Sequence, residues 1–321
     1  MTMKLQCAIL DDYQQVALKM ADWATIEEQV EVHSFSQHFE NEEDLIEEIK
    51  EYEIIVIMRE RTAFTASLFE KLPKLKLLIT SGMRNASIDL AAASTYGVTV
   101  CGTASSSEPP TELTWALLLN LARNITLENR ALRENGPWQS TVGADLHGRT
   151  LGLLGLGKIG GRMATIAQAF GMDVIAWSQN LTKEDTDKLG VRLANSKEEL
   201  LATSDFVSIH LVLSDRTRGI IGRQELEQMK RSAYLINTSR AAIVDQEALI
   251  KALEENRIAG AGLDVFEEEP MPEKHPYRTL PNVLATPHLG YVSEHNYRVY
   301  FTEAVEDIVA FLEGTEIRKI N

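Results

Sequence analysis

The feature that most constrains the fold is the alternation of short apolar runs with helix-like segments along almost the whole chain. Between the apolar runs lie segments with helical spacing, such as Leu45, Ile46, Ile49 and Tyr52. Strands that alternate with helices form parallel sheets covered on both faces. The runs that predict strands are 7–11, 31–35, 53–58, 75–80 and 98–101, and then 150–155, 173–177, 206–211, 233–238, 260–265 and 283–286. They are too many for one sheet of ordinary size, so we expect an α/β protein with two Rossmann-like, doubly wound parallel-sheet domains and a cleft between them.

Length and charge narrow the class of protein. The 321 residues fit two domains, and 44% hydrophobic with 25% charged residues is ordinary for a soluble globular chain. The net charge of -15 argues against nucleic acid and anionic membranes as partners, because both need a basic face. Two cysteines make no disulfide framework. With no apolar run long enough to span a membrane and no signal-peptide pattern, we expect a cytoplasmic protein.

A polar segment from Gly102 to Pro110, rich in Ser and Pro, is the first candidate for a link between the domains. The segment from Thr111 to Arg123 follows it with apolar residues on nearly every side. Such a pattern predicts a helix that is buried all round, either in a core or at a subunit interface.

A glycine motif marks the start of the second strand series. The sequence Gly155-x-Gly157-x-x-Gly160 closes one predicted strand and opens a helix, inside a βαβ unit of about 30 residues. In this context the first glycine permits a tight turn, the second lets a pyrophosphate approach the backbone, and the third lets helix and strand pack closely. The diphosphate would meet the unpaired N–H groups at the helix N-terminus. The motif therefore predicts a dinucleotide site.

The next strand lacks the acidic residue that usually bonds the ribose 2′-hydroxyl of NAD. Ser178 stands in that place, and no arginine follows to hold a 2′-phosphate. Ser178, Asn180, Thr182 or Lys183 could hold such a phosphate weakly. NAD and NADP therefore both stay open as the cofactor, with NAD slightly favoured.

Chemically useful side chains stand at the ends of the last three predicted strands. Arg240, Asp264 and His288 each follow a strand, and Glu269 comes shortly after Asp264. Ligands of open α/β sheets bind at the carboxyl ends of the strands. Any one of these residues alone is more often structural, but four of them beside a dinucleotide motif predict a catalytic site.

At this point the chain resembles the D-2-hydroxyacid dehydrogenase family. The resemblance rests on Gly155–Gly160 and on the stretches 237–245, 264–270 and 281–290, and 81–89 is similar to the family's substrate loop. It extends over nearly the whole chain. Besides Ser178, one position departs from the family: Ala241 replaces a glycine that is usual after the arginine.

The resemblance implies a role for each charged residue. His288 would be the general acid in keto-acid reduction and the base in the reverse direction, which suits an imidazole. Glu269 would hold His288 and favour its charged form. Arg240 would bind the substrate carboxylate and polarise its carbonyl. Backbone N–H groups of Gly82, Met83 and Arg84 would complete the carboxylate site.

The resemblance also implies the domains and the partners. Residues 1–101 with 290–321 would form a split, flavodoxin-like substrate domain, and residues 102–289 the dinucleotide domain. We expect a homodimer with the 111–123 helix near the contact, and a small carboxylate such as glyoxylate, hydroxypyruvate or a phosphoglycerate-like acid as substrate. The final helix has an apolar stripe formed by Tyr297, Phe301, Ala304, Ile308 and Phe311. The residues expected to bind the cofactor are Gly155, Gly157, Lys158, Ile159, Gly160, Ser178, Thr238, Asp264 and Gly290.

Two alternatives use the same frame. One is a dehydrogenase of formate or phosphite, although Glu269 speaks against formate because the resemblance implies an amide there. The other is a nucleotide-sensing binding protein similar to corepressors, which keep the same triad. Hydride transfer needs no metal, and the remaining histidines show no metal-ligand spacing. Arg59 and Arg61 are weaker substrate-binding candidates than Arg84.

Overall fold

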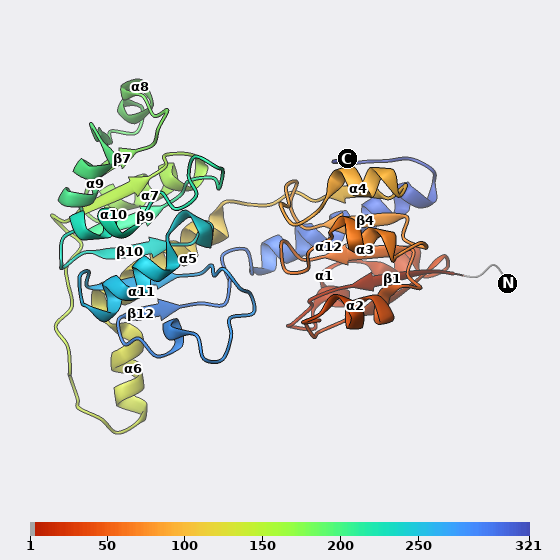
Figure 1. Ribbon diagram of the computed structural model, residues 1–321, viewed down its shortest axis with the longest axis horizontal. Coiled ribbons are helices and arrows are strands. Elements are labelled where there is room, and N and C mark those ends of the chain that lie inside the picture. The colour runs from red at the N-terminus through yellow and green to blue at the C-terminus, as the bar shows by residue number, and fades with distance from the viewer. Residues whose placement is uncertain (1–3) are drawn as a thin grey trace. The chain divides into compact units, whose positions relative to one another are not determined.

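The computed structural model describes residues 4–321 and divides into two compact units. Unit 1 comprises Met1–Ser106 and Ser293–Asn321, and unit 2 comprises Ser107–Val292. Each unit contains one parallel sheet with helices on its faces (Figure 1). The predicted pair of Rossmann-like α/β domains is confirmed. The observed boundaries lie at 106/107 and 292/293, within five residues of the expected ones. The first boundary falls inside the polar segment 102–110.

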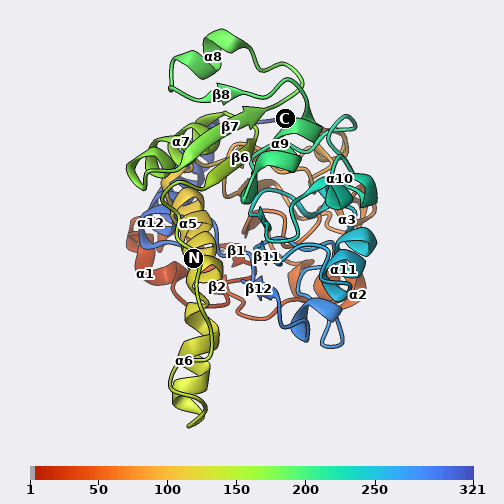
Figure 2. The ribbon, with the colours of Figure 1, turned by 90° about the vertical axis from the view of Figure 1, so that its left-hand side faces the viewer.

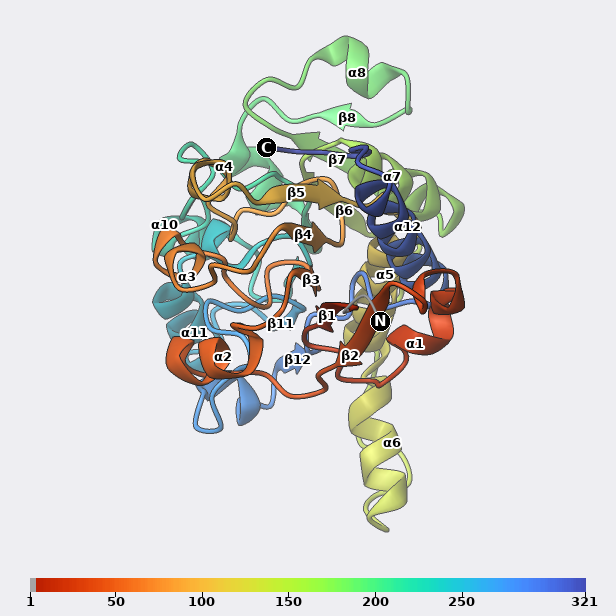
Figure 3. The same cartoon turned by 90° about the vertical axis from the view of Figure 1, so that its right-hand side faces the viewer.

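The sheet of unit 1 has the order β2-β1-β3-β4-β5, with all neighbours parallel (Figure 3). Its central strands are continuous apolar runs because both faces are covered, as in β3 and β4, where every residue is buried. The strands are β1 (Leu5–Ile9), β2 (Val30–Ser34), β3 (Ile54–Ile57), β4 (Leu77–Thr80) and β5 (Thr99–Gly102). The helices are α1 (Ala17–Met20), η1 (Trp23–Ile26), α2 (Glu42–Ile49), α3 (Ala66–Glu70) and α4 (Leu90–Thr95).

The last helix, α12 (Glu294–Leu312), returns to unit 1, which periodicity alone could not decide. It contacts α1, η1 and β4, and Tyr297, Phe301, Ala304 and Ile308 of its apolar stripe are buried. The C-terminal tail then pairs with β5, where the Ile320 N–H donates to the Val100 carbonyl at 2.9 Å. The end of the chain therefore packs against unit 1, where half-buried Ile320 contacts the core.

The sheet of unit 2 has the order β12-β11-β10-β9-β6-β7-β8, again parallel throughout (Figure 2). The strand order reverses between β6 and β9, and this is the place where open α/β sheets bind ligands at their carboxyl ends. The strands are β6 (Thr150–Leu154), β7 (Asp173–Trp177), β8 (Arg192–Leu193), β9 (Phe206–Ile209), β10 (Tyr234–Asn237), β11 (Gly260–Leu263) and β12 (Val283–Ala285).

The helices of unit 2 cover this sheet, apart from α6. They are α5 (Glu108–Arg123), α6 (Ile125–Arg133), α7 (Lys158–Ala169), α8 (Lys183–Asp187), α9 (Lys197–Thr203), α10 (Arg223–Gln228), η2 (Ala241–Ile243), α11 (Gln246–Glu254) and η3 (Pro276–Arg278). The expectation that α5 is buried all round is wrong within this chain. Glu112, Ala116 and Arg123 are exposed, because only part of its circumference packs on β10, β11 and α7.

Every predicted strand is present, with ends that move by a few residues. The strand that the sequence did not predict is β8, which has only two residues and lies at the sheet edge beside β7. Two residues are too short to give a periodic signal. Among residues 4–321, no helix combines the length and apolarity that crossing a bilayer requires.

Candidate functional site

The turn from β6 into α7 contains two glycines that no larger residue could replace unless neighbouring backbone atoms moved. Gly155 has a φ of +100°, and a Cβ there would lie 2.7 Å from the carbonyl oxygen of His210. A Cβ on Gly160 would lie 2.2 Å from the carbonyl oxygen of Gly155. These two glycines therefore serve the close packing of strand, turn and helix, as the motif predicted.

Gly157 differs, because a Cβ there would meet no described atom within 4 Å. It is the N-cap of α7, and no side chain in the described part of the chain caps that helix. The helix N-terminus thus offers backbone N–H groups next to open space, which fits the diphosphate of a dinucleotide. Lys158 is exposed and Ile159 half-buried on the first turn.

A hollow of about 480 Å³ adjoins this turn and has the size of a small-molecule pocket. Gly157 and Ser178 form its wall at the ends of β6 and β7, and Asn180 lies beside them. Three leucines make its apolar wall: Leu156, Leu181 and Leu189. An apolar wall beside polar groups suits an adenosine, so the residues present fit this part of a dinucleotide.

The end of β10 is tied to α5 by two threonines. The Thr238 and Thr114 hydroxyls are 2.7 Å apart, and Thr114 donates to the Pro110 carbonyl at 2.6 Å. Arg240 follows at the start of η2, where its Nη1 donates to the Ser239 carbonyl at 2.8 Å. The guanidinium of Arg240 is thus anchored at the carboxyl edge of the sheet.

Asp264 clamps the loop after β12 to the end of β11. Its Oδ1 accepts the Thr286 hydroxyl at 2.6 Å and the Leu289 N–H at 2.7 Å, while its Oδ2 accepts the Gly290 N–H at 2.8 Å. The side chain is fully buried, and this burial raises the pKa of its carboxyl. These hydrogen bonds fix the loop that carries His288, and the predicted role of Asp264 in binding the cofactor stays a prediction.

His288 and Glu269 form a direct pair. His288 Nδ1 lies 2.6 Å from Glu269 Oε2, and the other oxygen of Glu269 accepts the Phe266 N–H at 2.8 Å. The two side chains are 18% and 26% exposed, so solvent screens the pair only in part. His288 has a φ of +52°, and its ring packs edge-on against Tyr291. With Nδ1 held by a carboxylate, Nε2 is the atom that can exchange a proton with a ligand.

The strands explain why these residues share one edge. β10, β11 and β12 are parallel neighbours, so Arg240, Asp264 and His288 all follow the same edge of the sheet. His288 bonds Glu269, and Asp264 accepts the N–H groups of Leu289 and Gly290, the two residues that follow His288 in the chain. Arg240 follows β10 at the same edge, where its Nη1 donates to the Ser239 carbonyl.

His210 is a site residue that the sequence did not single out. It ends β9 at the point where the strand order reverses, and its carbonyl packs against Gly155. Its Nε2 lies 2.9 Å from the Ser208 hydroxyl, and burial lowers its pKa to about 4. The ring therefore stays neutral at physiological pH and supports the glycine turn without adding charge. Its position directly after a strand was the sequence feature that could have identified it as a site candidate.

Unit 1 carries the predicted substrate loop after β4. Gly82 has a φ of +91°, is buried, and donates its N–H to the Thr103 hydroxyl at 3.0 Å. That N–H is therefore committed within the unit, whereas Met83 and Arg84 are exposed. A Cβ at position 82 would overlap the guanidinium of Arg59. Arg59 thus packs against this loop, although the sequence ranked it below Arg84.

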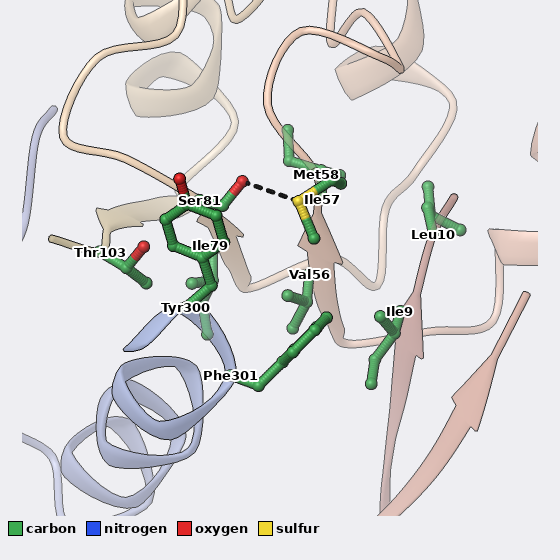
Figure 4. Close-up of a pocket in the computed structure, with 10 residues that line it drawn as sticks. All are labelled: Ile9, Leu10, Val56, Ile57, Met58, Ile79, Ser81, Thr103, Tyr300 and Phe301. Carbon is green, nitrogen blue, oxygen red and sulfur yellow. Dashed lines mark hydrogen bonds between the residues drawn. The ribbon is translucent and has the colours of Figure 1, made fainter. Parts of the chain in front are cut away.

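A small cavity also lies in unit 1, between α12 and the carboxyl ends of β1, β3 and β4 (Figure 4). Its walls are mainly aliphatic and aromatic, with Tyr300 and Phe301 on the α12 side. The polar contact drawn there is the Ser81 hydroxyl, which lies 3.3 Å from the sulfur of Met58. The cavity lacks a charged wall and has the character of a gap in core packing.

Comparisons with known proteins agree with this geometry. A family model described as the NAD binding domain of D-isomer specific 2-hydroxyacid dehydrogenases matches residues 115–290. The chain is 38% identical over 275 residues to the D-3-phosphoglycerate dehydrogenase of Methanocaldococcus jannaschii, covering 85% of this chain and 52% of that protein. It is 40% identical over 256 residues to the glyoxylate reductase of Aeropyrum pernix, covering 77% and 76%.

Among solved structures, the phosphoglycerate oxidoreductase of Vibrio cholerae superposes with a TM-score of 0.92 at 38% identity. The match covers 97% of this chain and 100% of that one. The chain spans about half the length of the Methanocaldococcus relative and about three quarters of the Aeropyrum relative.

Proposed function

Because this chain belongs to the D-isomer specific 2-hydroxyacid dehydrogenases, we propose that it interconverts a small D-2-hydroxy acid and its 2-keto acid with NAD(H) as hydride carrier. The observation that carries this proposal is the 2.6 Å pair of His288 and Glu269, on a loop clamped by Asp264. The pair stands at the carboxyl edge of the sheet that also carries the open glycine turn. Acid–base chemistry and hydride transfer need these two parts together.

The proposed proton path runs through His288. When bound, the nicotinamide supplies the hydride in reduction and accepts it in oxidation. During reduction, His288 Nε2 gives its proton to the carbonyl oxygen of the keto acid, which becomes the hydroxyl group. Glu269 holds Nδ1 and so orients the ring, with Nε2 free for this step. During oxidation, the same nitrogen removes the hydroxyl proton.

Arg240 is the proposed binding residue for the substrate carboxylate. A guanidinium matches a carboxylate with two parallel hydrogen bonds, and its charge also polarises the adjacent carbonyl. Its contact with the Ser239 carbonyl orients the side chain at low entropic cost. From unit 1, we keep Met83 and Arg84 as predicted substrate contacts. Gly82, whose N–H donates to Thr103, and Arg59, which packs against it, would support that loop.

The names of the relatives suggest which acids to test. The similar proteins are called D-3-phosphoglycerate dehydrogenase, glyoxylate reductase and, at 37% identity in Thermotoga maritima, hydroxypyruvate reductase. We therefore propose glyoxylate, hydroxypyruvate or a phosphoglycerate-like acid as substrate. These relatives do not favour the formate, phosphite or corepressor alternatives, and the carboxylate partner of His288 speaks against formate in particular.

The decisive experiment compares His288→Ala with His295→Ala, an exposed histidine on α12. With NADH and a panel of glyoxylate, hydroxypyruvate and 3-phosphohydroxypyruvate, the His288 variant should lose roughly a thousandfold in kcat. Its affinity for NADH should change little, and the His295 variant should behave like the wild type. Turnover by His288→Ala at the wild-type rate would reject the proposed acid.

We also propose that a second copy of the chain covers α6 and the loop after it. None of the α6 side chains in the described structure is buried, and α6 extends away from the sheet of unit 2 (Figure 2). Its exposed apolar residues continue in the loop, where Trp138 is 82% and Val142 98% exposed. Analytical ultracentrifugation should give a dimer for the wild type and a weaker one for Trp138→Ser. A monomeric wild type at micromolar concentration would contradict the homodimer.

A further inference from the structure

The hollow beside Gly157 carries charged groups that the dinucleotide motif does not include. Asp185 of α8 and Lys188, which follows it, also line this hollow. The end of β7 supplies no carboxylate, because Ser178 occupies that position. Any charge selection between cofactors in this hollow must therefore come from α8.

The Asp185 carboxylate is fixed in place. Its Oδ2 accepts the Thr182 hydroxyl at 2.6 Å and the Thr182 N–H at 3.2 Å, which forms a capping box at the start of α8. The hydrogen bond from the Thr182 side chain is the main reason that the pKa of Asp185 lies below its usual range. Asp185 is therefore a permanent negative charge on the wall of the hollow.

Lys188 does not offset this charge fully. Its ammonium group lies 3.2 Å from Glu184 Oε1 and 3.7 Å from Asp185 Oδ1, so its positive charge is shared between two carboxylates. The remaining pair of this segment, Lys183 with Asp187, is neutral as a unit. From 183 to 188 the chain has more carboxylates than ammonium groups, and the local field repels a further anion.

We propose that Asp185 makes this chain select NAD(H) over NADP(H), by repelling a 2′-phosphate from the hollow. The inference rests on the proposed function, since it assumes that the hollow receives the adenosine of the cofactor. Asp185 lies on the helix that follows β7. It thereby provides the selection that an acidic residue at the end of β7 would otherwise provide. Ser178 is left to bond a ribose hydroxyl without adding charge.

Binding measurements test the proposal without catalysis. Calorimetry on the wild type should give at least about tenfold tighter binding of NADH than of NADPH, and of 5′-AMP than of adenosine 2′,5′-bisphosphate. Asp185→Asn keeps a side chain that can cap Thr182 but removes the charge. It should tighten NADPH and the bisphosphate by about fivefold, with NADH and 5′-AMP nearly unchanged.

Asp187→Asn is the matched control, because it removes the same charge from the same helix without lining the hollow. It should shift the NADPH affinity by much less than Asp185→Asn. Adding Ser178→Asp to the Asp185→Asn variant should restore the rejection of NADPH, because it returns a carboxylate to the hollow from β7. A thermal melt of each variant shows whether the fold is kept.

The outcomes separate the two proposals. If NADH binds tightly and Asp185→Asn leaves the NADH-to-NADPH ratio unchanged, or Asp187→Asn changes it as much, selection by Asp185 is overturned and the cofactor site stands. Equal affinity of the wild type for NADH and NADPH would also overturn selection by Asp185 and leave the cofactor site standing. If neither dinucleotide binds the wild type, the cofactor site itself is wrong and both proposals fall.

Discussion

The first strand-to-helix turns of the two units are similar in topology and opposite in chemistry. In unit 1, the Asp12 carboxylate after β1 accepts the N–H groups of Val16 and Ala17 at 3.0 and 3.1 Å. In unit 2, Gly157 after β6 has no side chain, and the N–H groups at the start of α7 face open space. A carboxylate that occupies the helix N-terminus excludes a phosphate, whereas a glycine leaves room for it. Parallel-sheet topology alone therefore does not make a dinucleotide site.

Each unit also contains a histidine paired with a carboxylate, and their surroundings differ. His38 Nδ1 lies 3.0 Å from Asp11 Oδ1, and Asp11, almost fully buried, also accepts the Thr62 hydroxyl at 2.6 Å. His288 and Glu269 are both partly exposed, on a loop at the sheet edge. The two histidines are equally exposed, at 19% and 18%, so the units differ in the carboxylate: Asp11 is buried, whereas Glu269 is 26% exposed.

The largest effect should follow from giving unit 2 the turn chemistry of unit 1. Gly157→Asp places a carboxylate where the diphosphate is expected, so the affinity for NADH should fall at least about a hundredfold. The fold should be kept, because a Cβ at this position meets no described atom within 4 Å, and an Asp N-cap stabilises a helix by about 1 kcal/mol. Fluorescence titration with NADH and a thermal melt measure the two effects.

Gly157→Asn is the uncharged control for that change. It caps the helix in a similar way without the charge, so it should lose clearly less affinity than Gly157→Asp. Equal NADH affinity in wild type and Gly157→Asp would show that the open helix N-terminus does not receive the phosphates.

A smaller loss should follow from breaking the pair of unit 2. Glu269→Gln replaces the charged partner of His288 Nδ1 with a neutral amide. The value of kcat for keto-acid reduction should fall roughly thirtyfold, which corresponds to one charge-assisted hydrogen bond of about 2 kcal/mol. NADH affinity should not change, which stopped-flow binding can check. Asp11→Asn, the corresponding change in unit 1, should lower stability in urea while kcat stays nearly constant. A Glu269→Gln enzyme with wild-type kcat would contradict the role of the pair.

The smallest effect concerns His38 and depends on pH. The hydrogen bond with Asp11 raises the pKa of His38 above its ordinary value of about 6.5, against the opposing effect of burial. A raised folded-state pKa contributes stability that is fully present below the unfolded pKa and is lost as the pH rises through the folded pKa. Urea denaturation of wild type and His38→Ala should therefore differ by about 1 kcal/mol at pH 5.5 and by less at pH 8.5. A difference that grows with pH would have the wrong sign.

Much of this architecture was determined by the sequence itself. Buried parallel strands must be continuous apolar runs, as 54–57 and 77–80 are, so the strands could be predicted from local pattern. The glycine motif could be predicted too, because steric demands at Gly155 and Gly160 leave no other residue type. Arg240, Glu269 and His288 were identified as site candidates because strand ends are visible in the sequence, and their catalytic roles stay predictions.

Only the tertiary structure decided what each polar group does. Asp264 accepts hydrogen bonds from Thr286, Leu289 and Gly290, which a strand-end position alone did not predict. Three other features depend on residues from elsewhere in the chain. They are the neutral state of His210, the packing of Arg59 on Gly82 and the position of Asp185 on the wall of a hollow. Hydrogen bonds and burial depend on contacts between residues that are distant in the chain, and a local sequence pattern does not determine these contacts.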